Sequence, residues 1–403
     1  MAIFYWYDTR DLRPLEPVYV SSVDSGNLAG HLIALANTCD EWQNQLYSPQ
    51  AQQGLCDNLA LAQLSLQQAP TLLLQSQSGL QLQAILSQLD QLLQQNQGLQ
   101  HQHSQLTELC EQGVQIASAR QNTTFTRHTE QQLSAQQSLL FYLQALQTTL
   151  AEQYLQLNSG AAEQQHQHLQ LQLLATQCRQ FAMAMNFAFF IDPERNLLSI
   201  GYAVEENRLD TSCYDLLASE ARLASLFAIA KGDADSKHWF RLGRSATPLG
   251  YGSALLSWSG SMFEYLMPSL VMRAAAGSLL EQSNRLIVER QIGYGRQLGI
   301  PWGISESAYN ARDLEFTYQY SNFGVPGLGL KRGLAENKVI APYATALATM
   351  VNPVAACANF ERLKACGALA DYGFFEAIDY TRTRLPDDTS LALVQSFMAH
   401  HQA

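Results

Sequence analysis

Apolar residues recur at helical spacing through much of the first half of the chain. Residues 43–180 are rich in Gln, contain no Lys, and repeat Leu or Ile at intervals of three, four and seven, the period of an amphipathic helix. The clearest runs are Leu82, Ile85, Leu89, Leu92, Leu99, Leu106 and Leu109, then Leu139, Leu143, Leu146 and Leu150, and then Leu169, Leu173 and Leu174. Because Gln and Leu both favour helices, we expect a scaffold of long helices broken near Pro70 and residues 158–160. A coiled coil is the alternative, but the spacing drifts and the flanking charge pairs are missing.

Shorter apolar runs lie on either side of this segment. A Pro-punctuated extended stretch at residues 3–27 leads into a helix that continues to Trp42, with Asp24 or Ser25 as the expected N-cap. Residues 187–209 surround a Pro-Glu-Arg-Asn turn and predict a β-hairpin, either a flap or a simple connector. Further helices are expected at residues 215–231, 261–275, 279–298, 341–350, 353–365, 371–378 and 390–403. About a dozen helices joined by short turns, with few strands, predict an all-α toroid rather than a doubly wound sheet.

Two aromatic segments interrupt the helical pattern. Residues 299–332 combine Gly and Pro at both ends with six aromatic residues and three carboxylates, which argues against one long helix. Aromatic faces pack on sugar rings and carboxylates serve glycosidic chemistry, so this stretch is either a carbohydrate site or a connector whose aromatic residues fill the core. The N-terminal Trp6, Tyr7 and Asp8 are likewise either a ligand-facing lip or a segment that docks on the core.

Four glutamates have apolar or aromatic sequence neighbours. They are Glu220, expected in mid-helix, Glu264, Glu306 and Glu376. A carboxyl on an apolar face is costly to bury unless it is paired or its pKa rises, so each is a candidate acid, nucleophile or sugar anchor. The alternative is a structural ion pair, for example between Glu220 and Arg222 or Arg241.

Composition restricts the possible partners. The net charge of −11 would repel a nucleic-acid backbone, and no basic stripe offsets it. No apolar run is long enough to span a bilayer, and the N-terminus does not resemble a signal peptide. Seven scattered Cys residues without C-x-x-C spacing are expected to be reduced thiols of a cytosolic chain. His238 and the pair at 400–401 match no metal motif, so we expect neither a metal nor a cofactor.

Several long motifs resemble a known family. They include Phe4-Tyr-Trp-Tyr-Asp-Thr-Arg, Tyr214-Asp-Leu-Leu-Ala-Ser-Glu-Ala-Arg, Ser257-Trp-Ser-Gly-Ser-Met-Phe-Glu-Tyr, Pro301-Trp-Gly-Ile-Ser-Glu-Ser, Phe323-Gly-Val-Pro-Gly-Leu-Gly-Leu-Lys-Arg and Met398-Ala-His-His-Gln. In this order they resemble the central, glucoamylase-like domain of bacterial cyclic β-1,2-glucan synthases. The resemblance covers both ends and nearly all of residues 190–402, whereas the Gln-rich segment matches only in being helical.

The resemblance implies a fold, an activity and a larger context. The fold is an (α/α)6 barrel with a short β-hairpin and long loops at its mouth. The chain is then one domain over residues 1–403, in which residues 43–180 are a scaffold and residues 187–403 carry most of the catalytic motifs. The implied activity is cyclisation of linear β-1,2-glucan by transglycosylation with retained anomeric configuration. The implied partners are glycosyltransferase and phosphorylase-like domains of a large inner-membrane protein, of which this chain would be an excised cytoplasmic domain without a membrane span.

The resemblance also suggests roles for individual residues. It implies that Glu220 is the acid/base and Glu306 the nucleophile, with their order less certain than the pair itself, and that Glu264 anchors the substrate. The residues expected to bind glucan are Trp6, Tyr7, Asp8, Asp24, Trp258, Glu264, Tyr265, Trp302, Tyr309, Tyr318, Glu376 and His400. Three other functions stay open: a hydrolytic endo-β-1,2-glucanase on the same fold, a glucan-holding module without catalysis, and a helical interaction protein.

Overall fold

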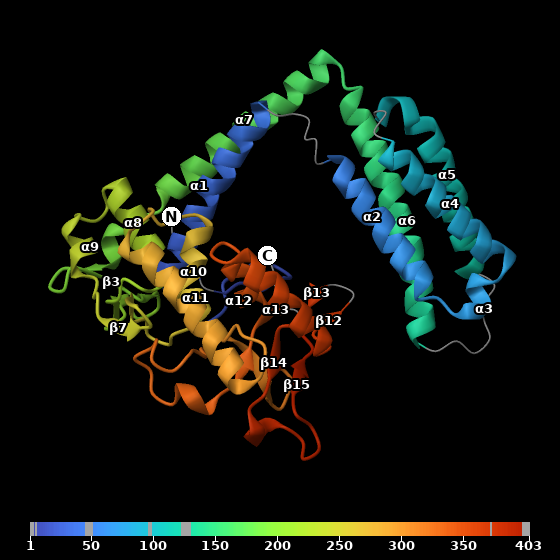
Figure 1. Cartoon of the computed structure of the whole chain (residues 1–403). Coiled ribbons are helices and arrows are strands. Elements are labelled where there is room, and N and C mark those ends of the chain that lie inside the picture. Colours follow the sequence, from blue (N-terminus) through green and yellow to red (C-terminus); the bar gives the residue numbers. More distant parts are fainter. Residues whose placement is uncertain are drawn as a thin grey trace. The chain divides into compact units, whose positions relative to one another are not determined.

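The computed structural model describes the chain except residues 1–3, 5, 45–50, 96–98, 122–129, 371–372 and 397–403. The chain forms two compact units, one comprising residues 1–36 and 176–403 and the other residues 37–175. Helix α1 (Ser22–Asn44) leaves the first unit and α7 (Ala161–Ala184) returns to it (Figure 1).

The second unit consists of the predicted long helices. They are α2 (Ala51–Gln67), α3 (Thr71–Leu74), α4 (Gln77–Gln94), α5 (Leu99–Gln121) and α6 (Glu130–Leu157). Helices α2, α4, α5 and α6 pack side by side (Figure 1) around fully buried leucines that include Leu82, Leu89 and Leu143. These leucines belong to the repeat described above, so the helical interpretation of this segment is confirmed. Ser76 begins α4 by accepting a hydrogen bond from the Gly79 N–H.

The first unit adds shorter helices and carries the candidate site. These helices are α8 (Arg222–Lys231), α9 (Lys237–Arg241), α10 (Met262–Leu266), α11 (Leu279–Leu298), α12 (Pro342–Ala348) and α13 (Pro353–Ala365). Helices α11 and α13 match their predicted bounds because both ends carry strong signals. Ser278 caps the start of α11, Gly299 ends it with a φ of 70°, and Asn352 caps α13 just before Pro353.

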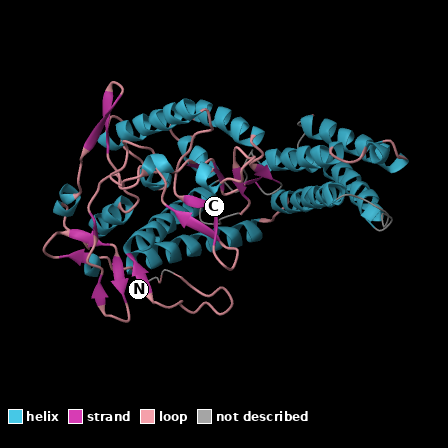
Figure 2. Ribbon diagram, turned by 90° about the horizontal axis from the view of Figure 1, so that it is seen from below, coloured by secondary structure: helices cyan, strands magenta, loops and turns pink. Residues whose placement is uncertain are grey.

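Short strands connect the helices of the first unit (Figure 2). The described residues contain fifteen strands in six small sheets, so the expectation of few strands was wrong. The strands are β1 (Tyr19–Ser21), β2 (Ile191–Asp192), β3 (Leu197–Ser199), β4 (Gly201–Ala203), β5 (Arg208–Leu209), β6 (Cys213–Tyr214), β7 (Ala246–Leu249), β8 (Gly252–Leu255), β9 (Ser307–Arg312), β10 (Tyr318–Ser321), β11 (Val339–Ile340), β12 (Leu369–Ala370), β13 (Gly373–Phe374), β14 (Ala377–Asp379) and β15 (Ala392–Val394). The predicted hairpin at 187–209 is confirmed as β2 and β3, with β6 adding to β3.

Several predicted helices are strands or are shorter than expected. Residues 371–378 and 390–403 were expected as helices, but their described parts form β13, β14 and β15, and residues 397–403 lie outside the description. Short apolar runs do not distinguish a buried strand from a helix by period alone, and β14 is fully buried between β11 and β15. Pro268 limits α10, which continues only as a 3-10 turn at Met267–Leu270.

Two helix starts differ from prediction in ways that affect the site. Helix α1 begins at Ser22, and Ser21 accepts the hydrogen bond from the Asp24 N–H, so neither Asp24 nor Ser25 is the N-cap. Helix α8 begins at Arg222, so Glu220 lies in the turn before the helix and the mid-helix placement was wrong. No described helix has both the length and the apolar character needed to cross a membrane.

Candidate functional site

Glu220 and Glu306 lie in one electrostatic environment. Burial raises the pKa of Glu306 to about 8, and the negative charges of Glu220 and Glu264 add to the rise. Burial likewise raises the pKa of Glu220 to about 7, with Glu264 again adding to it. Asp24 contributes to both shifts. Carboxyls far apart along the chain therefore converge on one site, in which both Glu220 and Glu306 keep partial exposure to solvent.

The turn that carries Glu220 is held by Arg222. The Arg222 side chain is 2% exposed and donates to the carbonyls of Ser219 at 3.0 Å and Glu264 at 2.8 Å, and to that of Tyr265. One guanidinium therefore joins the start of α8 to the end of α10. Because burial and hydrogen bonding commit Arg222 to backbone carbonyls, the suggested structural ion pair with Glu220 is reduced to a long-range attraction.

Helix α8 is also fixed by α1 and by His238. A side chain at Gly26 of α1 would place its Cβ 2.3 Å from the Ala224 Cβ, so only glycine permits this close approach. His238 is fully buried and bonds through its ring nitrogens to the Asn196 carbonyl and the Ser225 hydroxyl, both at 2.9 Å. These contacts place the first turn of α1, with Asp24, beside the Glu220 turn.

Tyrosine hydroxyls surround Glu306, which immediately precedes β9. Tyr320 of β10 hydrogen-bonds to the Glu306 carboxylate and opposes the rise in its pKa. The Tyr343 hydroxyl donates to the Glu306 carbonyl at 2.9 Å and lies 2.7 Å from the Ser305 hydroxyl. Ser305 in turn accepts from the Phe263 N–H at 3.1 Å. Burial and the charge of Glu306 raise the pKa of Tyr343 well above its ordinary value.

Glu264 forms a helix cap at the start of α10. Its carboxylate accepts from the hydroxyls of Ser257 at 2.8 Å and Ser259 at 2.6 Å, and from the backbone N–H groups of Ser259 and Ser261 at 3.1 Å. The Ser261 hydroxyl in turn accepts a hydrogen bond from the Glu264 N–H, which completes a capping box. Internal donors thus engage both carboxylate oxygens, so the geometry favours a role in positioning the site over direct contact with glucan.

A cavity of about 810 Å³ shares Asp24 and Tyr343 with the surroundings of Glu220 and Glu306, although neither glutamate lines it. Its polar lining includes Asp24 and Glu376, and Tyr343 connects it to Glu306. Its apolar lining includes the aromatic rings of Phe263, Phe360, Phe374 and Phe375. Carboxylates beside aromatic rings form a surface suited to the hydroxyl edges and apolar faces of sugar rings.

The remaining predicted binding residues fall into three groups. Trp6, Tyr7 and Trp258 expose 60%, 39% and 56% of their surface to solvent. Tyr265 and Trp302 are core residues, with exposures of 2% and 3%. Both rings therefore fill the core, and for Trp302 this was the alternative interpretation of the aromatic stretch at residues 299–332.

The other four are engaged by neighbours or lie outside the described residues. Asp8 is paired with Arg10 at 2.7 Å, and this hydrogen bond lowers the pKa of Asp8. Tyr309 and Tyr318 lie under the guanidinium groups of Arg384 and Arg312, at 4.8 and 4.2 Å. His400 lies outside the described residues.

Sequence reasoning missed the groups that hold the two glutamates. Tyr320 and Tyr343 approach Glu306 from β10 and α12, and Arg222 reaches across to α10. None of these contacts leaves a spacing signal, because each joins separate elements. The capping bonds of Glu264 did have a signal, since Ser261 and Glu264 match the Ser-x-x-Glu capping box.

The raised pKa values predict a pH-dependent cost in stability. The ordinary glutamate value is 4.5, so between about pH 4.5 and 8 the folded chain binds more protons than the unfolded chain, and stability falls as pH rises. At pH 8 we expect Glu306→Gln to have a free energy of unfolding about 1–2 kcal/mol higher than that of the parent, after allowance for solvent screening. Below pH 4.5 the two free energies of unfolding should be equal. Thermal unfolding at pH 4 and pH 8 measures this. Glu315→Gln, an exposed site on the same hairpin, is the control and should show no pH-dependent gain.

Comparisons with known proteins place these residues in a family context. Residues 213–403 match the family model described as putative glucoamylase. The chain is 46% identical over 407 aligned residues to the cyclic β-(1,2)-glucan synthase NdvB of Rhizobium meliloti (strain 1021), a match that covers 99% of this chain and 14% of that protein. A mutant endo-β-1,2-glucanase from Talaromyces funiculosus, solved with β-1,2-glucan, matches with a TM-score of 0.45 and 14% identity over 72% of this chain and 65% of that one.

Proposed function

Because this chain is homologous along nearly its whole length to one segment of a cyclic β-(1,2)-glucan synthase, we propose that it is the cyclising enzyme domain of such a synthase. It acts as a retaining transglycosylase that converts linear β-1,2-glucan into rings. The observation that carries this proposal is the convergence of Glu220 and Glu306: burial raises the pKa of both carboxyls, the charges of Glu264 and Asp24 act on both, and the charge of Glu220 also raises the pKa of Glu306. Carboxyls whose pKa values are raised by burial and by neighbouring carboxylates are candidates for catalytic acids and nucleophiles.

The proposed reaction uses the two glutamates in turn. The Glu306 carboxylate attacks the anomeric carbon of an internal glucose, and the departing 2-oxygen takes the electron pair of the broken bond and a proton from Glu220, directly or through a bridging hydroxyl. The 2-hydroxyl at the non-reducing end of the same chain then gives its proton to Glu220 and displaces Glu306. Two displacements retain the configuration, and no water is consumed. Ring closure competes with water because a tethered hydroxyl has a high effective concentration.

The surroundings of the pair support this division of roles. Near neutral pH the two carboxyls together bind about one proton, because burial raises the pKa of both and the charge of Glu220 raises that of Glu306 further. In the free site Glu306 has the higher pKa of the two. The hydrogen bond from Tyr320 favours the charged form of Glu306, which is the form a nucleophile needs. We therefore place the shared proton on Glu220 when substrate is bound.

The cavity that Tyr343 links to Glu306 is the proposed glucan site. Asp24 and Glu376 would accept bonds from sugar hydroxyls, while the phenyl rings of the lining would cover sugar faces. The exposed rings of Trp6, Tyr7 and Trp258 would extend this surface along a longer chain. Tyr309 and Tyr318 would border it from the β9–β10 hairpin, and His400, which lies outside the described residues, keeps its proposed role.

The domain would belong to a larger protein. We propose an (α/α)6 barrel over residues 1–403, with residues 43–180 as scaffold and the cavity at its mouth. Glycosyltransferase and phosphorylase-like domains of the same inner-membrane synthase would be its partners on the cytoplasmic side. The chain spans 14% of the relative's length, so the rest of a protein of that size could hold both domains.

Incubation with linear β-1,2-glucan tests the function directly. A cyclising enzyme yields products that resist exo-acting glucosidases without new reducing ends. New reducing ends would instead identify an endo-β-1,2-glucanase. Binding of glucan without either product would identify a holding module, and an absence of binding would favour the helical interaction protein.

Tyr320→Phe tests the support for Glu306. Removal of the hydroxyl takes away a bond that favours the charged carboxylate, so the pKa of Glu306 should rise further above about 8. We expect the rate of ring formation at pH 7 to fall about tenfold, in line with the loss of one hydrogen bond to a charged group, and the acidic limb of the pH–rate profile to move to higher pH. Tyr251→Phe, at a fully exposed tyrosine, is the control and should leave the profile unchanged.

A further inference from the structure

Strand β9, which begins directly after Glu306, is held along one edge by buried carboxylates. The Ala308 N–H donates to Glu376 at 3.2 Å, and the Asn310 N–H donates to Asp379 at 3.1 Å. Residues 308 and 310 are two apart, so their N–H groups point to the same edge of the strand. Glu376 and Asp379 are 2% and 0% exposed. The side-chain carboxylates thus accept hydrogen bonds from backbone N–H groups that would otherwise pair with a neighbouring strand.

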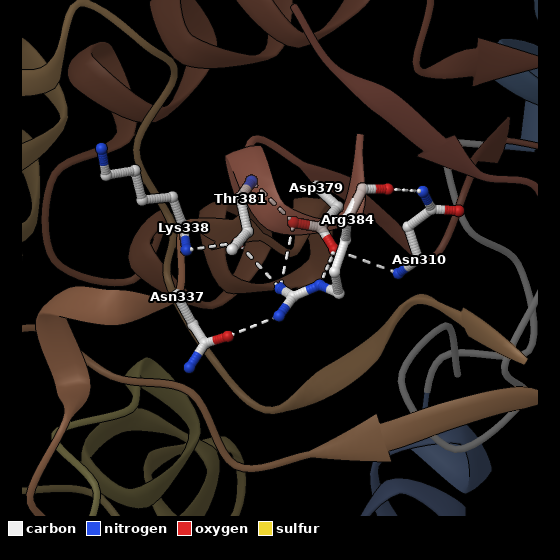
Figure 3. Close-up of polar contacts among 6 residues, drawn as sticks. All are labelled: Asn310, Asn337, Lys338, Asp379, Thr381 and Arg384. Atoms are coloured by element: carbon white, nitrogen blue, oxygen red, sulfur yellow. Dashed lines mark hydrogen bonds and ion pairs between the residues drawn. The ribbon is translucent and has the colours of Figure 1, made fainter. Parts of the chain in front are cut away.

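Arg384 completes this arrangement (Figure 3). Its guanidinium bonds to both Asp379 oxygens, at 2.7 and 3.1 Å, and to Asn337 at 2.6 Å and Thr381 at 2.8 Å. Its backbone carbonyl accepts from the Asn310 side chain at 2.6 Å. The guanidinium of Arg384 also lies over the Tyr309 ring, 4.8 Å from its centre. Asp379 and Arg384 therefore hold Asn310 through its backbone and its side chain, and hold Tyr309 from above.

We propose that Arg384 and Asp379 are positioning residues that fix β9 and thereby direct the Glu306 carboxylate towards Glu220. The inference rests on the proposed function, because it assigns these residues to the same reaction. Glu306 is anchored upstream by Tyr343 at its own carbonyl, and the ion pair supplies the anchor downstream. A buried ion pair adds little net stability compared with apolar residues of the same size, so its presence beside the site favours a geometric role.

The test compares Arg384→Met with Arg382→Met in the full chain. We expect Arg384→Met to lower kcat for ring formation about 100-fold, as a displacement near 1 Å does, and to change KM less than about twofold. Arg384→Lys should recover part of the rate, because a lysine keeps the charge but not the fork of donors. Arg382 is 64% exposed, with an ion pair to Asp387 at 3.7 Å, so Arg382→Met should behave as the parent.

A second measurement does not depend on activity. The pH-dependent stabilisation by Glu306→Gln reports how deeply Glu306 is buried and how close it lies to the other carboxyls. We expect this stabilisation to shrink at least twofold when Glu306→Gln is made in an Arg384→Lys background, because a looser β9 exposes Glu306 to solvent and separates the charges. If the parent forms no rings, the proposed function fails while this measurement still decides the inference.

Two results would overturn the inference. One is an Arg384→Met chain that is folded and keeps the parental kcat. The other concerns Leu363→Ala, a variant in the buried core of α13 that controls for general destabilisation. The inference fails if Arg384→Met loses no more kcat than Leu363→Ala does for the same fall in melting temperature. If Arg384→Met does not fold, Asp379→Asn replaces it, since this change keeps the shape and removes the charge of the pair.

Discussion

Glutamine in place of Glu306 should abolish ring formation from linear β-1,2-glucan while the chain stays folded and binds glucan. The amide has nearly the same shape as the carboxyl but cannot attack the anomeric carbon, so we expect a fall in kcat of about 10⁴-fold or more. Glu220→Gln should lose about 10²–10⁴-fold, the usual contribution of a general acid. Ring products separated by chromatography, together with glucan binding by calorimetry, measure both effects.

Azide rescue assigns the two roles. In Glu306→Ala, azide would attack the anomeric carbon in a single displacement and give an inverted glucosyl azide. In Glu220→Ala, azide would displace Glu306 from the glycosyl-enzyme and give a retained azide. Opposite anomers would reverse the assignment. Glu315→Gln, at an exposed position of the β9–β10 hairpin, should form rings at the parental rate. Parental activity in Glu306→Gln would contradict catalysis by this residue altogether.

Local signals predicted the fold where both ends of an element carried them. The cap at Ser278 and the glycine at 299 delimit α11, and Asn352 and Pro353 start α13. Residues 373–379 had no such signals. Strand β14 depends on pairing with β11 and β15, and β13 depends on pairing with β12, which a local pattern does not contain.

The candidate site followed from motif resemblance and not from spacing. Glu220 and Glu306 were singled out within long motifs, and the structure adds that the charge of Glu220 raises the pKa of Glu306 and that Glu264 and Asp24 act on both. Tyr320, Tyr343 and Arg384 were not predicted, because their contacts join β10, α12 and the segment after β14 to the Glu306 region. Glu264 shows the converse. A buried glutamate in an apolar sequence suggested a sugar anchor, but the four donors around it make it a helix cap.

The segment that holds Glu264 is itself clamped by a crossing loop. Leu328 and Leu330 bond to Ser257, Val325 bonds to Gly260, and Lys331 bonds to the Trp258 carbonyl at 2.8 Å. The two backbones approach so closely that a Cβ on Gly324 would lie 1.8 Å from the Ser259 carbonyl oxygen. Because the obstacle is backbone, no rotamer change relieves it.

Gly324→Ala should therefore lower the free energy of unfolding of this unit by about 3 kcal/mol or more, at the upper end for overpacking. Ser259, which the new methyl group would displace, supplies two of the donors to Glu264, so the cap of α10 weakens with it. Gly293→Ala is the matched control. It lies within α11 with open space at its Cβ, and alanine there should stabilise the helix by about 0.5–1 kcal/mol. Urea unfolding followed by tryptophan fluorescence measures both changes, since Trp6, Trp239, Trp258 and Trp302 all belong to this unit and only Trp42 does not. Equal unfolding midpoints for Gly324→Ala and the parent would mean that the crossing loop separates from residues 257–261 without cost, and the clamp would then have no part in holding Glu264.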